Sequence, residues 1–217
     1  MTDGLINSMA SDDGSADQRI YGVVVAQVIS NMDALTQGRV QLKFPWMPNV
    51  EPWARLASPS AGSSRGMYFV PQVGDEVLVA FEAGDVNQPY VIGSLWNMSD
   101  RPPATLPTDA VNKRIIKTPL GHEIEIDDLT QSIKISTITG QKIEIEPTAI
   151  SLETTGGTAA VKLETTGTLT IQAALRIEIK AASISLEGEL VEIKSSAAAT
   201  IDGGLACNIQ GQLVKIN

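Results

Sequence analysis

The only histidine, His122, is the first side chain to consider for catalysis, because an imidazole beside Glu123 could act as a general acid or base. A catalytic triad would also need a serine or cysteine nucleophile and a group that orients the base. The sequence offers His122 no such companions. The histidine follows a Leu-Gly step, which is typical of a turn that opens a strand. We therefore expect no catalytic role for it.

Two pairs of adjacent carboxylates, Asp75-Glu76 and Asp127-Asp128, and the single Cys207 are the other candidates. Neighbouring residues on a strand point to opposite faces, so the two carboxylates of Asp75 and Glu76 cannot converge on one substrate atom. We expect both pairs to be solvated or to form turns. A single cysteine excludes an intramolecular disulfide and a CxxC motif. Cys207 is expected to be a small apolar residue, which three copies could place on a common axis. No catalytic, cofactor or metal site is predicted.

The composition changes sharply along the 217 residues. The chain is 43% hydrophobic but only 4% aromatic, and all nine aromatic residues lie between Tyr21 and Trp96. Aromatic side chains normally supply the largest blocks of buried area, so the second half must pack small and branched side chains in a regular, non-globular way. The formal net charge of −9 argues against nucleic-acid binding. No signal peptide or membrane-spanning run is visible, so we expect synthesis in the cytoplasm.

Three zones precede a C-terminal repeat. Residues 1–19 are rich in Asp, Ser and Gly and predict a flexible N-terminal arm. Residues 20–97 contain six short runs of β-branched and aromatic residues, which predict a small closed or partly closed barrel. The runs are YGVVVAQVIS, GRVQLKFPW, WARLAS, GMYFVPQV, DEVLVAF and PYVIGSLW. Residues 98–114 contain three prolines and are predicted to be a linker.

Residues 115–217 repeat an apolar pair of the form I-x-I, and each pair starts seven to eleven residues after the last. Because strand side chains alternate, both members of a pair point to one face and the polar residue between them points to the other. Glycine-containing steps between pairs predict corners. The predicted core residues are Ile124, Ile126, Ile133, Ile135, Ile143, Ile145, Val161, Leu163, Ile177, Ile179, Val191 and Ile193.

A short strand with two apolar groups cannot bury them by itself, so it needs neighbours with the same pattern. A single-chain solenoid would need longer coils, and the predicted interior here holds only Ile, Leu and Val. The repeat therefore favours an intertwined triple-stranded β-helix, or β-prism, in which each chain of a homotrimer contributes one strand per level.

Four ordered motifs stand in the barrel zone: Gly38 to Trp46 (GRVQLKFPW), Trp53 to Leu56 (WARL), Pro71 to Phe81 (PQVGDEVLVAF) and Gly84 to Gly93 (GDVNQPYVIG). In this order they resemble the oligonucleotide/oligosaccharide-binding (OB) domain of the phage baseplate V and VgrG spike family. That family also carries a repeat of short strands directly after the OB domain. The resemblance covers residues 20–217 and implies an all-β protein with an N-terminal OB-fold barrel followed by a trimeric β-helix shaft.

The resemblance implies a non-enzymatic central spike of a contractile tail, in a phage, an R-type bacteriocin or a related injection system. Such a spike is assembled into the baseplate of a virion or extracellular contractile particle. It punctures the target cell envelope when the sheath contracts, and meets the target membrane transiently. The implied partners are a hub protein and a tube initiator at the OB end and a PAAR-type tip protein at the C-terminus. The residues expected to dock the tip protein are Ile209, Leu213, Val214 and Ile216.

By comparison with larger members of this family, we expect a form without the hub domains that precede the OB domain and without the lysozyme domain that follows it. Some relatives hold a metal at the apex through His-x-His pairs, and this sequence has none. Two other classes stay open. A trimeric β-helical adhesin would fit the repeat but not the OB motifs. A polysaccharide-degrading tail component would need sugar-stacking aromatics, which the repeat lacks.

Overall fold

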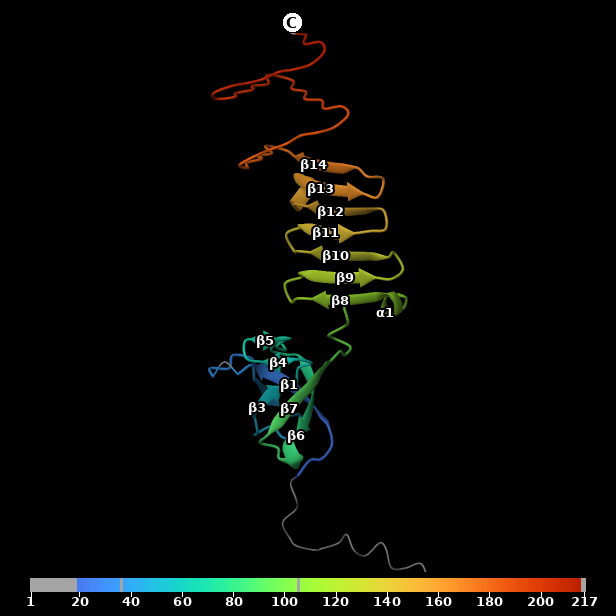
Figure 1. Cartoon of the computed structure of the whole chain (residues 1–217). Helices are drawn as coiled ribbons and strands as arrows, with labels where there is room; N and C mark the ends of the chain where they lie inside the picture. Colours follow the sequence, from blue (N-terminus) through green and yellow to red (C-terminus); the bar gives the residue numbers. More distant parts are fainter. Residues whose placement is uncertain (1–18, 36, 105, 216–217) are drawn as a thin grey trace, which may run out of the picture.

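The computed structural model describes residues 19–35, 37–104 and 106–215. Residues 1–18 of the predicted arm lie outside the described residues. Figure 1 shows a small β-barrel, then a tall sheet whose strands are stacked one above another, then a C-terminal segment that continues in wide swings. None of the helices in the described ranges has the length or apolar character that a membrane span requires. The all-β expectation is confirmed.

The barrel consists of five strands that close in the order β1-β2-β3-β7-β6. The pairing of β3 with β7 is parallel, and the other pairings are antiparallel. The strands are β1 (Val24–Ser30), β2 (Val40–Lys43), β3 (Trp53–Leu56), β6 (Glu76–Phe81) and β7 (Pro89–Leu95). A five-stranded barrel of this kind is the OB architecture. The expected OB-like barrel is therefore present.

Alternation along the strands builds the barrel core. In β6, Val77, Val79 and Phe81 are buried while the residues between them stay partly exposed. Phe44, just after β2, is the largest fully buried side chain, and its ring centroid lies 5.7 Å from that of Phe81. Large rings fill this core, as the confinement of the aromatic residues to the first half leads us to expect.

One of the six predicted barrel runs does not form a barrel strand. In GMYFVPQV, only the first glycine belongs to a strand, the short β5 (Arg65–Gly66), which pairs with β4 (Ala61–Gly62) in a hairpin outside the barrel. Tyr68 and Phe69 are 77% and 65% exposed. The prediction of a strand was wrong here, because this run has apolar composition but no neighbouring strand to pair with.

The loop between β1 and β2 is held by a carboxylate clamp. Asp33 accepts hydrogen bonds from the backbone N–H of Leu35 and Gln37, both at 3.0 Å, and from that of Arg39 at 3.4 Å. Arg39 also donates its Nε and Nη2 hydrogens to the same carboxylate, at 3.1 and 2.9 Å. The guanidinium lies 5.7 Å from the centroid of the Trp53 ring. These donors, the Arg39 side chain first, hold the pKa of Asp33 far below its usual value.

The shaft sheet has seven strands in sequence order, each antiparallel to the next. It begins at Lys113, after the short helix α1 (Asp109–Asn112), two residues before the predicted start. The strands are β8 (Lys113–Lys117), β9 (Glu123–Asp127), β10 (Ser132–Ser136), β11 (Lys142–Ile145), β12 (Ala149–Glu153), β13 (Ala159–Glu164) and β14 (Leu169–Ala173). Single-turn 3₁₀ helices lie at Glu82–Gly84 and Thr155–Gly157.

The strand pairing in residues 113–173 differs from the predicted intertwined arrangement. All seven strands belong to one chain and form one sheet, whereas the prediction had three chains intertwined, each contributing one strand per level. The physical reason lies in the turns. Gly121, Gly140 and Gly167 have positive φ values of 98°, 91° and 90°, which glycine adopts without strain. Each donates its N–H to the carbonyl three residues earlier, at 2.9 to 3.0 Å, so the chain reverses and returns along the same sheet.

Candidate functional site

The side chains of the shaft sheet form two continuous apolar columns on one face. The strand register places Ile133 directly between Ile126 and Ile145, and Ile135 directly between Ile124 and Ile143. The first column contains Ile126, Ile133, Ile145, Ile150, Leu163 and Leu169, and the second contains Ile116, Ile124, Ile135, Ile143, Leu152, Val161 and Ile171. We call this set of residues the apolar face.

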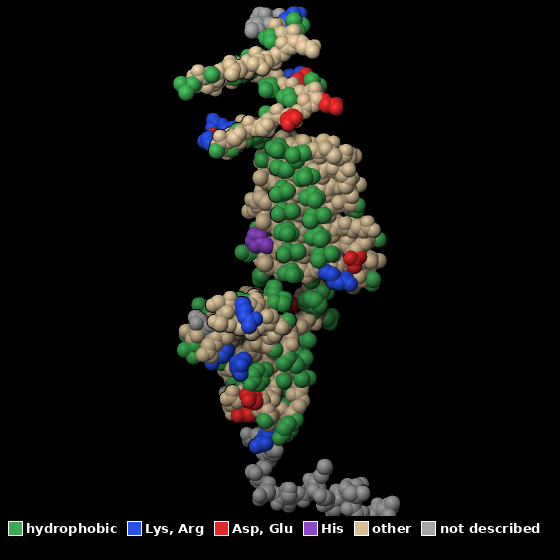
Figure 2. All heavy atoms as spheres, viewed as in Figure 1, with side chains coloured by type: hydrophobic (Ala, Val, Ile, Leu, Met, Phe, Trp, Pro, Cys, Tyr) green, Lys and Arg blue, Asp and Glu red, His purple; other side chains and the backbone are tan. Residues whose placement is uncertain are grey.

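The apolar face is uncovered in the single chain. Its isoleucines in β9, β10 and β11 are between 40% and 42% exposed, and the exposure of Ile171 rises to 53% in the last strand. Figure 2 shows hydrophobic side chains in rows that follow the sheet across its strands. In the part of the chain that the structure describes, these side chains keep a large exposed fraction, and Ile177 of the segment after β14 approaches the second column. A contiguous apolar surface of this extent marks an interaction site rather than ordinary surface.

The opposite face of the sheet carries charges of alternating sign. The register places Lys134 between Glu125 and Glu144, as the sequence pattern predicts. Elsewhere on this face, Lys113 lies 3.2 Å from Glu125, and Lys142 lies 3.2 Å from Glu153. These partners raise the pKa of both lysines. Solvent screens ion pairs of this kind, so each contributes little to stability and their main effect is to keep this face hydrated.

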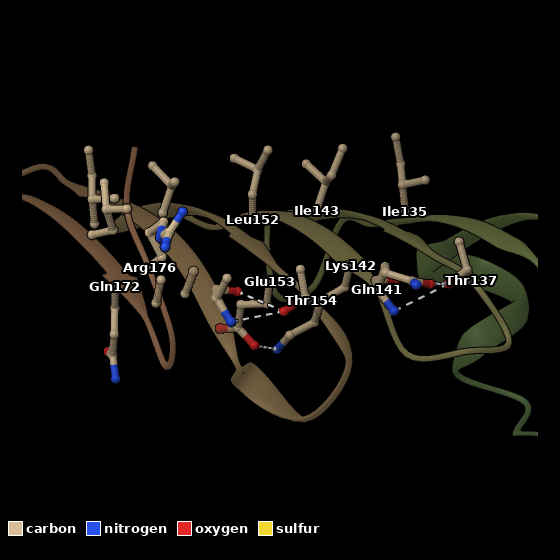
Figure 3. Close-up of a pocket in the computed structure, with 16 residues that line it drawn as sticks. Ile135, Thr137, Gln141, Lys142, Ile143, Leu152, Glu153, Thr154, Gln172 and Arg176 are labelled. Carbon is tan, nitrogen blue, oxygen red and sulfur yellow. Dashed lines mark hydrogen bonds and ion pairs between the residues drawn. The ribbon is translucent and has the colours of Figure 1, made fainter. Parts of the chain in front are cut away.

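Figure 3 shows how the two faces separate at one edge of the sheet. Ile135, Ile143 and Leu152 project side by side in one direction, while Lys142 and Glu153 project the other way. An open trough runs along this edge. Its apolar lining is formed by Ile135, Ile143, Leu152, Val161, Ile171 and, from the segment after the last strand, Ile177. Lys142, Glu153 and Arg176 also line it. Because the trough continues the second column of the apolar face, it belongs to the same candidate site.

The structure places the predicted core residues in two groups. Eight lie in the apolar face: Ile124, Ile126, Ile133, Ile135, Ile143, Ile145, Val161 and Leu163. Ile177, Ile179, Val191 and Ile193 follow the last strand and are 52% to 75% exposed. The predicted core set lacks Ile150, Leu152, Leu169 and Ile171, which belong to further I-x-I-type pairs, and it lacks Ile116, which continues the second column below Ile124. No I-x-I signal marks it, because its strand reads Lys-Arg-Ile-Ile-Lys.

Of the residues predicted to dock a tip protein, Ile209, Leu213 and Val214 are 65%, 83% and 48% exposed. Ile216 lies outside the described residues. These three side chains lie in the C-terminal segment beyond the sheet, at the end of the molecule away from the barrel (Figure 1). Their docking role stays a prediction.

The residues considered for catalysis have structural surroundings. His122 is exposed, and its backbone N–H bonds to the hydroxyl of Thr118 at 3.0 Å, within a turn that opens β9. Asp127 is 7% exposed and accepts the N–H groups of Leu129 and Thr130, so its predicted turn-forming role is confirmed. Asp75 likewise accepts the N–H of Gln72 at 2.8 Å.

Cys207 is exposed in the single chain. Within the described ranges, no three His, Cys, Asp or Glu side chains gather closely enough to hold a metal ion.

The sequence of the barrel matches a known family, described as the type VI secretion system/phage-baseplate injector OB domain, over residues 24–96. Three similar proteins are type VI secretion system spike proteins. VgrG2a of Pseudomonas aeruginosa is 33% identical over 106 residues, which cover 44% of this chain and 13% of the relative. VgrG3 of Vibrio cholerae is 36% identical over 87 residues, which cover 37% of this chain and 8% of the relative. VgrG5 of Pseudomonas aeruginosa is 38% identical over 87 residues, which cover 37% of this chain and 11% of the relative.

The chain therefore spans only a small part of the length of these relatives. Within that part, the family match coincides with the closed barrel, which runs from Val24 to Leu95. The resemblance noted in the sequence is confirmed: residues 24–96 match the type VI secretion system/phage-baseplate injector OB domain, and the N-terminal part of the chain is similar to VgrG-type spike proteins.

Proposed function

We propose that three copies of this chain assemble with their apolar faces inward to form the central spike of a contractile injection particle. The observation that carries the proposal is the apolar face, which runs over seven strands and is left uncovered by its own chain. Three such faces around an axis cover one another and leave the charged faces outside. The relationship to spike proteins supports the same role.

The proposed prism acts as a mechanical wedge. Its strands lie across the long axis, and its interior is a column of interdigitated Ile, Leu and Val side chains without polar groups. Interiors of this kind pack at crystal-like density and resist compression. The charged exterior stays hydrated as the shaft moves through a lumen or an envelope. In this proposal the shaft punctures the target envelope on sheath contraction, meets the membrane transiently, and makes or breaks no bonds.

The proposed partners lie at the two ends. The OB barrel joins the spike to the baseplate through the hub protein and tube initiator, and the exposed aromatic side chains of Tyr68 and Phe69 offer that contact a large apolar surface. At the other end, a PAAR-type tip protein docks on the C-terminal strands around Ile209 and Val214. The proposed domains are the arm at 1–19, the OB domain at 20–97, the linker, which was predicted to end at residue 114, and the shaft up to residue 217, whose sheet begins at Lys113.

Light scattering on the purified full-length chain tests the proposal directly. The expected molar mass is three times that of the chain, and negative-stain micrographs should show a globular head with a thin shaft. Ile179→Asp tests the core further, because it places three carboxylates at one level. A compact monomer, or an Ile179→Asp protein that still runs as a trimer resistant to heat and SDS, would contradict the proposal.

A further inference from the structure

The barrel carries a second exposed apolar surface, on the side that faces the shaft. A groove of about 630 Å³ lies beside the β4–β5 hairpin and is lined by Gln37, Gly38 and residues 56–62 and 64–69. Figure 1 shows this hairpin at the shaft-proximal end of the barrel. Met67, Tyr68 and Phe69 line the groove, and each is at least 49% exposed. Exposed apolar side chains gathered in this way mark an interaction site. We call it the shoulder groove.

The walls of the shoulder groove are fixed by hydrogen bonds and packing. Ser58 donates its hydroxyl hydrogen to the carbonyl of Met67 at 2.7 Å, and the N–H of Met67 bonds to the carbonyl of Ser60 at 2.9 Å. The ring of Tyr68 lies over the backbone of Gly38, where a Cβ atom would come within 3.2 Å of the ring. A groove that is already formed loses little conformational entropy when it binds.

The groove contains one cation without a partner. Arg65 is the single charged side chain among the described residues that line it. It takes part in none of the ion pairs within the described part of the chain, whereas Arg39 of the same barrel is paired with Asp33. A guanidinium group is suited to binding a carboxylate. A ligand of the shoulder groove should therefore combine apolar side chains with a carboxylate.

The chain itself contains a segment of this composition. Residues 1–18, which lie outside the described residues, contain four aspartates and no Lys or Arg. Leu5, Ile6 and Met9 stand between Asp3 and Asp12. The segment thus offers apolar side chains flanked by carboxylates, and its charge is opposite to that of Arg65.

The segment is also long enough to reach the groove of its own barrel. The N–H of Ile20 bonds to the carbonyl of Gly84 at 2.9 Å, which fixes the point where the segment leaves the barrel. Fifteen residue steps join Phe69 to Gly84 along the chain, and the same number joins Leu5 to Ile20. The first path includes turns, so the straight distance is shorter than the roughly 50 Å that an extended segment of that length spans.

We infer that residues 3–13 bind in the shoulder groove of their own barrel. The apolar side chains of the segment cover Tyr68 and Phe69, and one of its aspartates pairs with Arg65. This binding does not depend on the proposed trimer. The proposed hub contact uses the same aromatic side chains, so the segment covers them until the hub protein replaces it.

Disulfide trapping in the full-length chain tests the inference, in a Cys207→Ser background. Asn7→Cys is combined with Ser60→Cys, because Ser60 lines the groove and is exposed. The matched control combines Asn7→Cys with Ser94→Cys, another exposed serine, near the shaft-proximal end of β7 but outside the groove. Under mild oxidation the Ser60 pair should close about tenfold faster than the control, because binding raises the effective concentration of the thiols. After full denaturation the product should run as a single chain on a non-reducing gel.

The product and its rate separate the possible occupants. Equal rates for the Ser60 and Ser94 pairs would overturn the inference. A covalent dimer or trimer from the Ser60 pair would show that the segment of another copy fills the groove, which contradicts the assignment to its own barrel. Light scattering reports the trimer separately, so the failure of the proposed assembly would leave this result unchanged.

The role of Arg65 has its own test in the same Ser60 pair. Arg65→Glu should remove about tenfold of the rate advantage, since an attraction is exchanged for a repulsion, whereas Arg65→Lys should keep most of it. An Arg65→Glu protein that links as fast as its parent would refute the pairing of Arg65 with an aspartate of the segment.

Discussion

A carboxylate placed in the apolar face should prevent assembly, and Ile143→Asp is the sharpest form of this test. Ile143 sits in the second column, opposite Ile135 and Leu152, and 40% of its surface is exposed in the single chain. In the proposed trimer that surface is covered. The change puts three carboxylates at one level of the interior, between the apolar side chains of Ile135 and Leu152. The strand register places Arg114 on the same face, but in β8, opposite Ile126.

The size of the effect follows from two contributions. Full burial of an isoleucine is worth about 1.5 to 3 kcal/mol. Covering the 40% that is exposed gives about 0.6 to 1.2 kcal/mol per chain, or roughly 2 to 4 kcal/mol per trimer. Each unpaired buried carboxylate costs several kcal/mol more. The total is on the order of 10 kcal/mol, which corresponds to roughly a ten-million-fold loss in the association constant.

Light scattering over a dilution series measures this loss, and Thr170→Asp is the matched control. It introduces the same residue on the charged face, directly opposite Lys162, where a carboxylate finds a cation. The Thr170→Asp protein should keep the mass and heat resistance of the unsubstituted chain. An Ile143→Asp protein that assembles as well as the control would refute the argument that the apolar face is the trimer interior.

Two further predictions concern the barrel. Trp46, Trp53 and Trp96 all precede the shaft, so tryptophan fluorescence reports unfolding of the barrel without a contribution from the shaft. Phe44→Ala removes the largest fully buried ring and should lower the free energy of unfolding by about 3 to 5 kcal/mol, measured by denaturant titration of that signal. A loss below about 1 kcal/mol would contradict the core described. Asp33 has a folded-state pKa below its unfolded value of about 3.9, so its stabilising contribution is present above that pH and is lost as the pH falls further. Asp33→Asn should lower the melting temperature of the barrel at pH 7. The melting temperature of this variant should also decrease less between pH 5 and pH 2.5 than that of the unsubstituted chain. The same decrease in both proteins would count against the clamp.

Local patterns predicted the apolar pairs and most barrel strands because each depends on alternation within a few residues. The pairing of whole strands could not be predicted in this way. An I-x-I pair looks the same whether its neighbour is the next strand of its own chain, as for Ile133 and Ile145, or a strand of another copy. The difference lies in the backbone of the turns, at glycines such as Gly140, and a glycine alone does not reveal its φ angle.

Other features depend on contacts that no short motif encodes. The Asp33–Arg39 clamp joins residues six apart in an irregular loop, and its geometry depends on the strands that flank it. The strand predicted around Tyr68 has the right composition but meets no partner, because the barrel closes without it. In both cases the tertiary arrangement decided what the local sequence left open.

The antiparallel meander of residues 113–173 makes the length of the spike adjustable in fixed increments. Each strand runs opposite to the one before it. If two consecutive strands are removed, the chain therefore still leaves the sheet on the same side. Removing one strand would make the chain leave the sheet on the opposite side. Neighbouring strands lie about 4.8 Å apart, so shafts of this design can lengthen or shorten in steps of about 10 Å. The number of hairpins therefore sets the length of the sheet.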